Sequence, residues 1–288
     1  MSSTDVKATL FYLKHDTRWQ REKPYTLFVD VSNIPGAENT NIEKEAVGDI
    51  VVRDARSSPT LLTLDVHGFE VMRLSEDVFK PESFEDPVWT EANYYPFLCK
   101  AVQQALGAKE VRVYEHKVRY RFPGFGDLRL RSALDYDPPI PQVHADLSHE
   151  YGLQLFTERW PEGLISNRLQ VINIWRPLNI KVTEWPIALC SCSSVDREVD
   201  LQRTDQVKRL KGSSEADNKF VVMESYTSFY NSAHQWWYLK DQCFNEAWII
   251  KLFDSKAGVA ENVLHTAIDI GQSPDARKSI ETRMMVVY

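Results

Sequence analysis

Short apolar runs separated by turn residues dominate the first 90 positions of the chain. Valine, leucine and aromatic residues are frequent in these runs, and they favour the pleated, half-buried surface of a β-sheet. A loop is expected at 32–41, where proline, glycine and asparagine cluster. The runs that we expect to form strands are KATLFYL (7–13), YTLFVDV (25–31), DIVVRDA (49–55) and TLLTLDVHGFEVM (60–72).

Two later segments are expected to be helical. Apolar residues recur at helical spacing within 89–107, and Gly107 is a natural C-terminal stop for that helix. A second helix is expected around 147–158. Between them, valines alternate with charged residues over 110–122, which predicts a strand.

The second half of the chain again reads as a series of strands. The segment 196–219 is highly charged, and we expect it to be a surface excursion. Many short strands with turns between them, braced by few helices, favour a mainly β sandwich or barrel. The strands expected here are 168–178, in which Pro177 marks an end or an edge, 186–195, 219–229, 234–240, 247–255 and 283–288.

Composition and charge narrow the function. The chain has 288 residues, of which 43% are hydrophobic and 26% charged, so a packed core is expected in one large domain or two small ones. The net charge of −7 argues against a broad nucleic-acid surface. No apolar stretch approaches the roughly 20 residues that cross a bilayer, and the N-terminus lacks a secretory signal. We therefore expect a cytoplasmic protein, monomeric or homodimeric, without membrane or nucleic-acid partners.

The four cysteines do not form a recognisable site in the sequence. Cys190 and Cys192 make a C-x-C pair, and no second close pair completes a zinc site. Four cysteines in a chain of this length are no disulfide scaffold. We expect all four to be structural.

The segment PQVHADLSHE (141–150) contains the first chemical motif. Side chains at i and i+2 of a strand point the same way, so His144 and Asp146 would aim an imidazole and a carboxylate at one point. H-x-D alone is a weak signal. A second histidine from a distant strand would complete two histidines and one carboxylate, the set that binds non-haem Fe(II) and leaves positions open. The histidines available for that position are His15, His67, His116, His149, His234 and His265.

His265 is distinguished by the residues that follow it. If 277–288 is extended, Arg277, Ser279 and Arg283 share one face with Glu281. A guanidinium binds a carboxylate through two hydrogen bonds, and a serine hydroxyl adds a donor. The order H-x-D, distant histidine and R-x-S therefore suits iron together with 2-oxoglutarate. The same three ligands could instead hold Zn²⁺ in a hydrolase or lyase built on a cupin barrel.

Blocks along most of the chain carry a family resemblance. The sequence resembles the fungal family of iron- and 2-oxoglutarate-dependent hydroxylase/desaturase proteins that includes gibberellin desaturase. It is also similar to the second subunit of the bacterial cephem 7-alpha-methoxylase. The segment DQCFNEAWIIK (241–251) differs from the sequence that is usual in this family. The blocks are LTLDVHGFEV (62–71), YYPFLCKAVQQALGAKEVRVYEHKVR (94–119), VHADLS (143–148), VINIWRPL (171–178), WPIALCSCSSV (185–195), LFDS (252–255), HTAIDI (265–270) and RKSIETRMMVVY (277–288).

The resemblance implies a double-stranded β-helix, the jelly-roll barrel also found in cupins. It implies His144, Asp146 and His265 as iron ligands, and an arginine of the final strand for 2-oxoglutarate. We prefer Arg277, with Ser279, and keep Arg283 as the second choice; the arginine not used would bind a substrate carboxylate or a buried acid.

The implied reaction is hydroxylation, desaturation or oxidative cyclisation of a small-molecule specialised metabolite with O2. A non-catalytic partner subunit of another oxygenase is the remaining alternative. We expect one oxygenase domain over 1–288, with 1–90 as a strand-rich extension packed on the barrel and 196–219 as an insertion or lid.

Five further residues are expected to line the substrate pocket. Arg176 would bind an anion or pair with Asp254. The other four are Asn173, Trp175, His116 and Tyr238, and packing in the core is an equally open role for Trp175. Structural roles are expected for His15, His67 and His234, and a solvated position for His149 beside Glu150.

Overall fold

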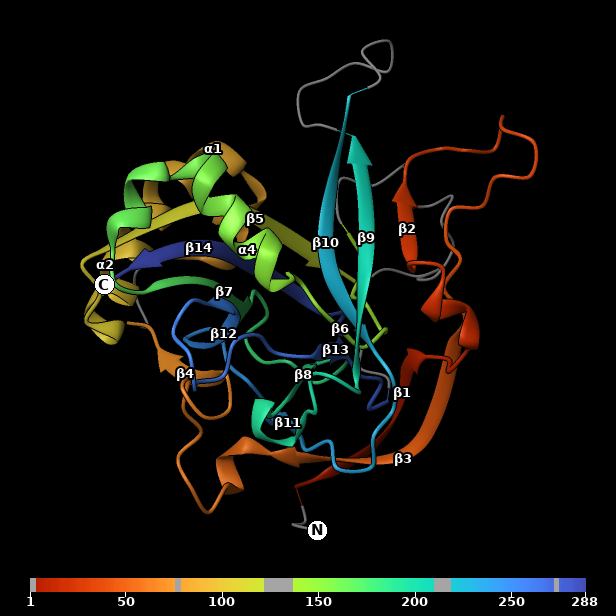
Figure 1. The fold of residues 1–288 in the computed structure, drawn as a ribbon. Helices are drawn as coiled ribbons and strands as arrows, with labels where there is room; N and C mark the ends of the chain where they lie inside the picture. The colour runs from red at the N-terminus through yellow and green to blue at the C-terminus, as the bar shows by residue number, and fades with distance from the viewer. Residues whose placement is uncertain (1–3, 76–78, 122–136, 210–218, 272–274) are drawn as a thin grey trace.

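Two β-sheets packed face to face form the body of the protein (Figure 1). The computed structural model describes residues 4–75, 79–121, 137–209, 219–271 and 275–288. The mainly β architecture predicted from the sequence is confirmed. None of the helices in the described ranges is long and apolar enough to cross a membrane.

The larger sheet has nine strands and runs through the H-x-D motif. Its pairs are antiparallel except β3–β11 and β2–β9, which are parallel. In spatial order the strands are β1 (Val6–Leu13), β3 (Lys44–Asp54), β11 (Trp236–Tyr238), β8 (Ile187–Cys190), β13 (His265–Ala267), β6 (His144–Ala145), β10 (Phe220–Ser228), β9 (Leu201–Arg209) and β2 (Tyr25–Phe28).

The smaller sheet has five antiparallel strands and carries the R-x-S motif. β7 lies at its centre, and every residue of β7 is buried because both faces of this sheet are covered. In spatial order the strands are β4 (Phe69–Arg73), β12 (Glu246–Asp254), β7 (Leu169–Pro177), β14 (Lys278–Val287) and β5 (Glu110–Tyr120).

Helices cover the outer face and one end of the smaller sheet (Figure 1). Gly107 ends the first long helix with a φ of 62°, a left-handed conformation that glycine adopts without strain. Ser148 caps the second, because its hydroxyl accepts from the backbone N–H of Tyr151. The helices are α1 (Pro87–Trp89), a π-helical turn (Thr90–Tyr94), α2 (Tyr95–Leu106) and α4 (His149–Arg159). Short 3-10 segments are Thr17–Gln20, Ala55–Ser57, Pro81–Glu85, Pro161–Ile165 and Cys192–Ser194.

The two faces of β7 belong to two different cores. Val171 and Trp175 face the larger sheet and pack in the core between the sheets. Ile172 and Ile174 face outward and pack under α2. Strand alternation therefore decides which residues of β7 reach the space between the sheets.

The expected strands and helices are mostly present, with three corrections. The expectation that 196–219 is a surface excursion is wrong for Leu201–Arg209, which forms β9 within the larger sheet. The strand expected at 60–72 is extended only from Phe69 onward, where it forms β4 (Phe69–Arg73). The strand predicted at 186–195 ends at Cys190, after which Cys192–Ser194 forms a 3-10 turn. Residue 122 of the strand predicted at 110–122, and 210–218, lie outside the described residues.

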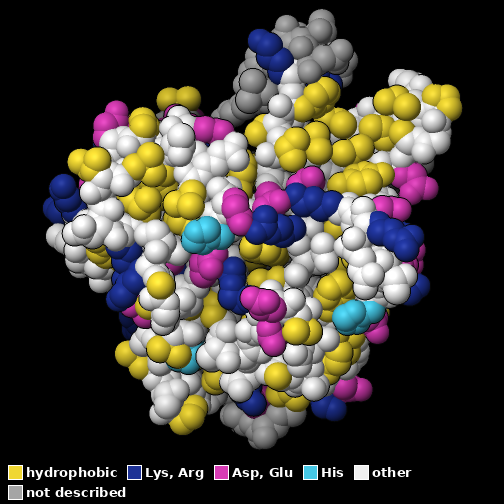
Figure 2. Space-filling view, in the orientation of Figure 1, with side chains coloured by type: hydrophobic (Ala, Val, Ile, Leu, Met, Phe, Trp, Pro, Cys, Tyr) yellow, Lys and Arg dark blue, Asp and Glu magenta, His cyan; other side chains and the backbone are white. Residues whose placement is uncertain are grey.

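Basic and acidic side chains are interleaved across the face of the molecule in Figure 2. They do not separate there into a basic region and an acidic region. Hydrophobic side chains gather on the same face around the projecting ends of β9 and β10, where Phe220 and Val222 are 46% and 52% exposed.

Gly152 is the point of closest approach between α4 and the smaller sheet. A Cβ built on Gly152 would lie 2.4 Å from Cγ of Phe253 on β12. Gly152→Ala should therefore lower the free energy of unfolding by about 1–3 kcal/mol, the usual cost of overpacking a core. At an exposed helix position, Gly→Ala would instead raise the free energy of unfolding by about 0.5–1 kcal/mol. The sign of the measured change therefore shows whether Gly152 is closely packed. Urea unfolding followed by circular dichroism measures it.

The control is Gln154→Ala, at an exposed position of the same helix. It should change the free energy of unfolding by no more than about 0.5 kcal/mol. A Gly152→Ala protein as stable as the wild type would contradict the close packing of α4 on β12.

Candidate metal centre

Main-chain pairing brings the H-x-D motif and the late histidine together. β6 lies between β10 and β13, and His265 of β13 is directly opposite His144 of β6. Opposed residues of an antiparallel pair point to the same face. Asp146 follows β6 and points to that face too, so the three side chains converge between the two sheets.

The ligand atoms of these three residues lie within 4.8 Å of one another. Asp146 Oδ1 is 3.5 Å from His144 Nε2 and 3.7 Å from His265 Nε2. The imidazole centroids are 4.3 Å apart. Each residue is at most 9% exposed. Two imidazole nitrogens and one carboxylate oxygen fit a divalent transition metal, and they occupy only one side of it.

The hydrogen bonds of both imidazoles leave Nε2 free for a metal. His144 Nδ1 is 2.7 Å from the carbonyl oxygen of Gln142, and His265 Nδ1 is 3.0 Å from that of Val263. A carbonyl oxygen only accepts, so each Nδ1 carries the proton and donates it. The unprotonated Nε2 atoms then point their lone pairs at the centre.

Electrostatics keep His265 and Asp146 in the protonation states that bind a metal. Burial, with a smaller effect of the neighbouring His144, lowers the pKa of His265 to about 4, so that imidazole is neutral at pH 7. Burial would raise the pKa of Asp146, but Arg283 and the two imidazoles outweigh it and hold that pKa well below its usual range.

Arg283 fixes the orientation of Asp146. Its Nη2 donates to Asp146 Oδ2 at 3.0 Å, and its Nη1 donates to Glu115 Oε2 at 2.9 Å. Glu281 lies 3.6 Å from the same guanidinium. Because Oδ2 is held by Arg283, Oδ1 is the oxygen of Asp146 that faces the histidines.

A second buried ion pair lies beside the first. Arg119 of β5 donates two hydrogen bonds to Glu281, at 2.9 and 3.1 Å, and a third to the carbonyl oxygen of Pro138 at 3.0 Å. Arg119 is not among the site residues predicted from the sequence. Strand alternation could have pointed to it, because Glu115, Lys117 and Arg119 share one face of β5.

Arg277 differs from these two arginines because, within the described ranges, its guanidinium forms no ion pair; its backbone N–H donates to Glu184 at 3.0 Å. Among the described residues, no carboxylate oxygen lies within 4 Å of its guanidinium. Its Nε and Nη2 are 3.3 and 3.2 Å from Ser279 Oγ, and Nη1 donates to the carbonyl oxygen of Trp185 at 2.6 Å. Burial and the nearby Arg119 lower its pKa to about 9. The R-x-S motif is thus a buried cation with a hydroxyl beside it.

One cavity joins the three ligands to Arg277. Trp175 forms part of its wall, and the guanidinium carbon of Arg277 lies 5.1 Å from the Trp175 ring centroid. Asn173, on the same face of β7, pairs with Arg283 across the strands. The residues around the cavity are Arg119, Ile140, His144, Asp146, Trp175, Ile187, His265, Thr266, Ala267, Arg277 and Glu281.

Arg176 is not in this cavity, which corrects the prediction. It is adjacent to Trp175 on a strand and therefore points to the opposite face. There it lies over the Phe244 ring at 3.9 Å and donates to the Phe244 carbonyl oxygen. The alternative ion pair with Asp254 is also absent, because Asp254 binds Arg168 and Lys251.

His116 and Tyr238 also lie away from the cavity, contrary to the prediction. His116 pairs with Thr282 on the outer face of the smaller sheet, and its Nδ1 is 2.6 Å from the Tyr95 hydroxyl of α2. Tyr238 packs in the core on the outer side of the larger sheet, and its hydroxyl donates to the carbonyl oxygen of Thr4.

The remaining histidines and the cysteines have local partners. His15 stacks on Phe229, and His234 lies 3.1 Å from Asp200. His67 Nδ1 accepts from the backbone of its own turn at Thr63. His149 is half-exposed and pairs with Glu261 at 3.1 Å. All four cysteines are free thiols.

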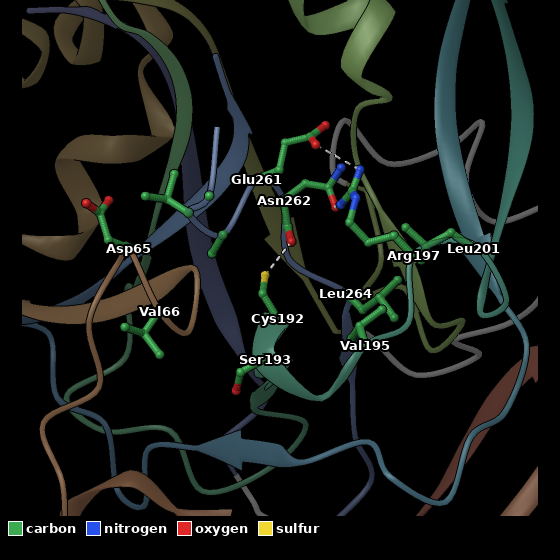
Figure 3. A pocket seen from close by; sticks show the side chains of 13 residues that line it. Asp65, Val66, Cys192, Ser193, Val195, Arg197, Leu201, Glu261, Asn262 and Leu264 are labelled. Carbon is green, nitrogen blue, oxygen red and sulfur yellow. Dashed lines mark hydrogen bonds and ion pairs between the residues drawn. The ribbon is translucent and has the colours of Figure 1, made fainter. Parts of the chain in front are cut away.

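A hollow of about 350 Å³ is lined by residues other than the three candidate metal ligands, and Figure 3 shows the side chains around it. Its charged groups are already paired, since Arg197 contacts Glu261 at 3.1 Å and Asn262 at 2.9 Å. Cys192 donates to the carbonyl oxygen of Asn262, and burial raises the pKa of its thiol to about 12. This hollow therefore offers no free charge or reactive thiolate.

Comparison with known proteins identifies the relatives of the chain. It is 25% identical over 83% of its length to the alpha-ketoglutarate-dependent dioxygenase tstK of Talaromyces stipitatus, covering 84% of that protein. It is 26% identical over 82% of its length to the hydroxylase/desaturase CTB9 of Cercospora beticola, covering 75% of that protein.

A solved structure shares the fold. The iron and alpha-ketoglutarate-dependent endoperoxidase NvfI superposes with a TM-score of 0.82 at 21% identity, over 100% of this chain and 99% of that one. The predicted double-stranded β-helix is thereby confirmed, as is the kinship with fungal 2-oxoglutarate-dependent hydroxylases and desaturases. The family described as "Oxidoreductase/YMDC permease-like domain" matches residues 10–287. The chain belongs to this oxidoreductase family.

Proposed function

We propose that the protein is a non-haem Fe(II)- and 2-oxoglutarate-dependent oxygenase that hydroxylates, desaturates or oxidatively cyclises a small-molecule specialised metabolite. One observation carries the proposal: His144, Asp146 and His265 converge in the same cavity as the unneutralised Arg277. The names of the relatives, which include dioxygenases and a hydroxylase/desaturase, support it.

The cavity favours this reaction over zinc hydrolysis. The three ligands alone would suit Zn²⁺ equally well. A hydrolase does not require a buried guanidinium without a counter-charge, whereas the distal carboxylate of 2-oxoglutarate supplies one. A non-catalytic subunit is also disfavoured, because all three ligands and their hydrogen-bonded supports are intact.

The side chains of this protein bind, orient and exclude water. His144, Asp146 and His265 hold the metal on one side, with Arg283 keeping Asp146 Oδ2 turned away. Arg277 and Ser279 bind the distal carboxylate of 2-oxoglutarate. The buried walls, including Trp175 and Ile187, keep bulk water from the reacting centre.

Iron and 2-oxoglutarate, when bound, provide the oxidising power to cleave an unactivated C–H bond. In hydroxylation, one atom of O2 enters the substrate and the other enters succinate, while 2-oxoglutarate loses CO2. In desaturation or cyclisation, the substrate loses two hydrogens, and water is formed instead of the alcohol.

Replacement of His265 should remove the metal site. His265→Ala leaves one imidazole and one carboxylate. Fe(II) affinity should therefore fall by more than about 10–100-fold, which is the loss typical when only a hydrogen-bond partner of a ligand is replaced. Anaerobic equilibrium dialysis measures the affinity, and succinate formation should stop. His15→Ala, at an exposed ring stacked on Phe229, is the control and should bind iron like the wild type. Wild-type protein without Fe(II) binding would refute the proposed function.

Arg277 should determine the affinity for 2-oxoglutarate. Loss of a buried charge pair costs about 2–5 kcal/mol, so Arg277→Gln should raise the KM for 2-oxoglutarate by about 30-fold or more. Fe(II) affinity without 2-oxoglutarate should be unchanged. Lys278→Gln is the matched control, because Lys278 is the next residue of β14 and pairs with Glu85. An unchanged KM in Arg277→Gln would remove Arg277 from this role.

Arg283 should act through Asp146 rather than through 2-oxoglutarate. Arg283→Gln removes the hydrogen-bond partner of Asp146 Oδ2, so Fe(II) affinity should fall by about 10–100-fold. At saturating iron, the KM for 2-oxoglutarate should stay within twofold, a change of at most about 0.4 kcal/mol. Glu115→Gln, which alters the more exposed partner of Arg283, should have the smaller effect on iron binding. A raised KM with normal iron affinity would instead assign Arg283 to 2-oxoglutarate.

A further inference from the structure

Lys208 of β9 is a partly buried cation that has no acidic partner in the part of the chain that the structure describes. Among the described residues, no carboxylate oxygen lies within ion-pair distance of its Nζ; Arg203, on the other face of the same strand, by contrast contacts Glu224. Its Nζ lies over the Phe28 ring of β2, 5.0 Å from the ring centroid. Removing an ammonium from water without a counter-charge is costly.

Strand register places Lys208 on the same face of the larger sheet as the metal ligands. Thr227 of β10 is directly opposite His144, so the two side chains share a face. Counting by twos along β10 from Thr227 leads to Met223 and Val221. Val221 is directly opposite Lys208. Lys208 therefore points into the space between the sheets, beyond the metal ligands along β10.

The charged groups that act on Lys208 lie on the smaller sheet or among the metal ligands, as the register of β9 and β10 requires. Burial lowers the pKa of Lys208 to about 8, and the positive charges of Lys117 and Arg283 lower it further, while Glu115 and Asp146 oppose them. Lys117 and Glu115 belong to β5, and Arg283 belongs to β14. Lys208 thus faces the smaller sheet across the barrel, within electrostatic range of the carboxylate of the metal site.

The other cations in this space are already neutralised. Lys117 lies 3.3 Å from Asp137. Arg119 is paired with Glu281, and Arg283 with Asp146. Under the proposed function, Arg277 is neutralised by 2-oxoglutarate. Of the described cations in this space, Lys208 then remains available to a further anion.

We propose that Lys208 binds a carboxylate of the primary substrate and so selects organic acids as the substrate class. The proposal rests on the proposed function, because it takes the space between Lys208 and the metal ligands as the substrate site. Phe28 and Met223 lie on the same face of the sheet and supply apolar surface beside the ammonium. A cation next to apolar surface suits an amphipathic acid.

The test compares acids with their neutral amides on the anaerobic Fe(II)–2-oxoglutarate protein. The probes are benzoate, 4-phenylbutyrate and 2-naphthoate, each beside its primary amide. Kd values come from ligand-observed NMR on the wild type, Lys208→Gln and the control Lys100→Gln, at an exposed lysine of α2. We expect at least one acid to bind the wild type more tightly than its amide. Lys208→Gln should weaken that acid about tenfold or more and leave the amide within twofold, while Lys100→Gln changes neither.

Failure of this proposal can be told from failure of the proposed function. The visible charge-transfer band of Fe(II) with 2-oxoglutarate should form equally in the wild type and in Lys208→Gln. Absence of the band from the wild type refutes the proposed function and with it this inference. With the band present, three outcomes overturn the role of Lys208 alone: acids that bind no tighter than amides, an acid Kd unchanged in Lys208→Gln, or a raised KM for 2-oxoglutarate in that variant.

Discussion

The antiparallel contact of His144 with His265 is the constraint on which the site depends. β6 and β13 are only two and three residues long, and each is held in place by its neighbours in the larger sheet. Because the backbone pairing fixes both histidines, their imidazoles must point to the same face. A slip of one residue would turn one imidazole away from the cavity. Sheet register, rather than local loop structure, therefore sets the geometry of the three ligands.

Because the ligands lie inside a barrel, the charged side chains around them are removed from water, which costs free energy. Each buried charge needs a partner or a ligand. Arg119 and Arg283 have theirs in Glu281 and Asp146, and these pairs brace the metal site. Arg277 and Lys208 do not have one among the described residues. The presence or absence of a carboxylate partner thus separates the arginines that hold the site in shape from the cations that are free to bind ligands.

Features of the site that depend only on residues close together in the chain could be predicted from the sequence. Alternation over 277–283 placed Arg277, Ser279, Glu281 and Arg283 on one face, and the structure buries all four. Alternation could also have excluded Arg176, because it is adjacent to Trp175 and both cannot face the same side. Which arginine is neutralised could not be predicted, since that depends on β5, which is paired with β14 from more than 150 residues away.

β9 was not predicted from the sequence, and the cause lies in the side chains that this strand carries. β9 reads as a charged surface segment because it lacks an apolar alternation. Its inward positions carry Gln206 and Lys208, and Gln206 donates to Ser225 of the neighbouring strand. Because these inward positions are polar, the alternation of apolar and polar residues that marks a half-buried strand is absent. The hydrophobic pattern therefore fails at β9 because its inner side chains include hydrogen-bonding and charged groups instead of apolar ones.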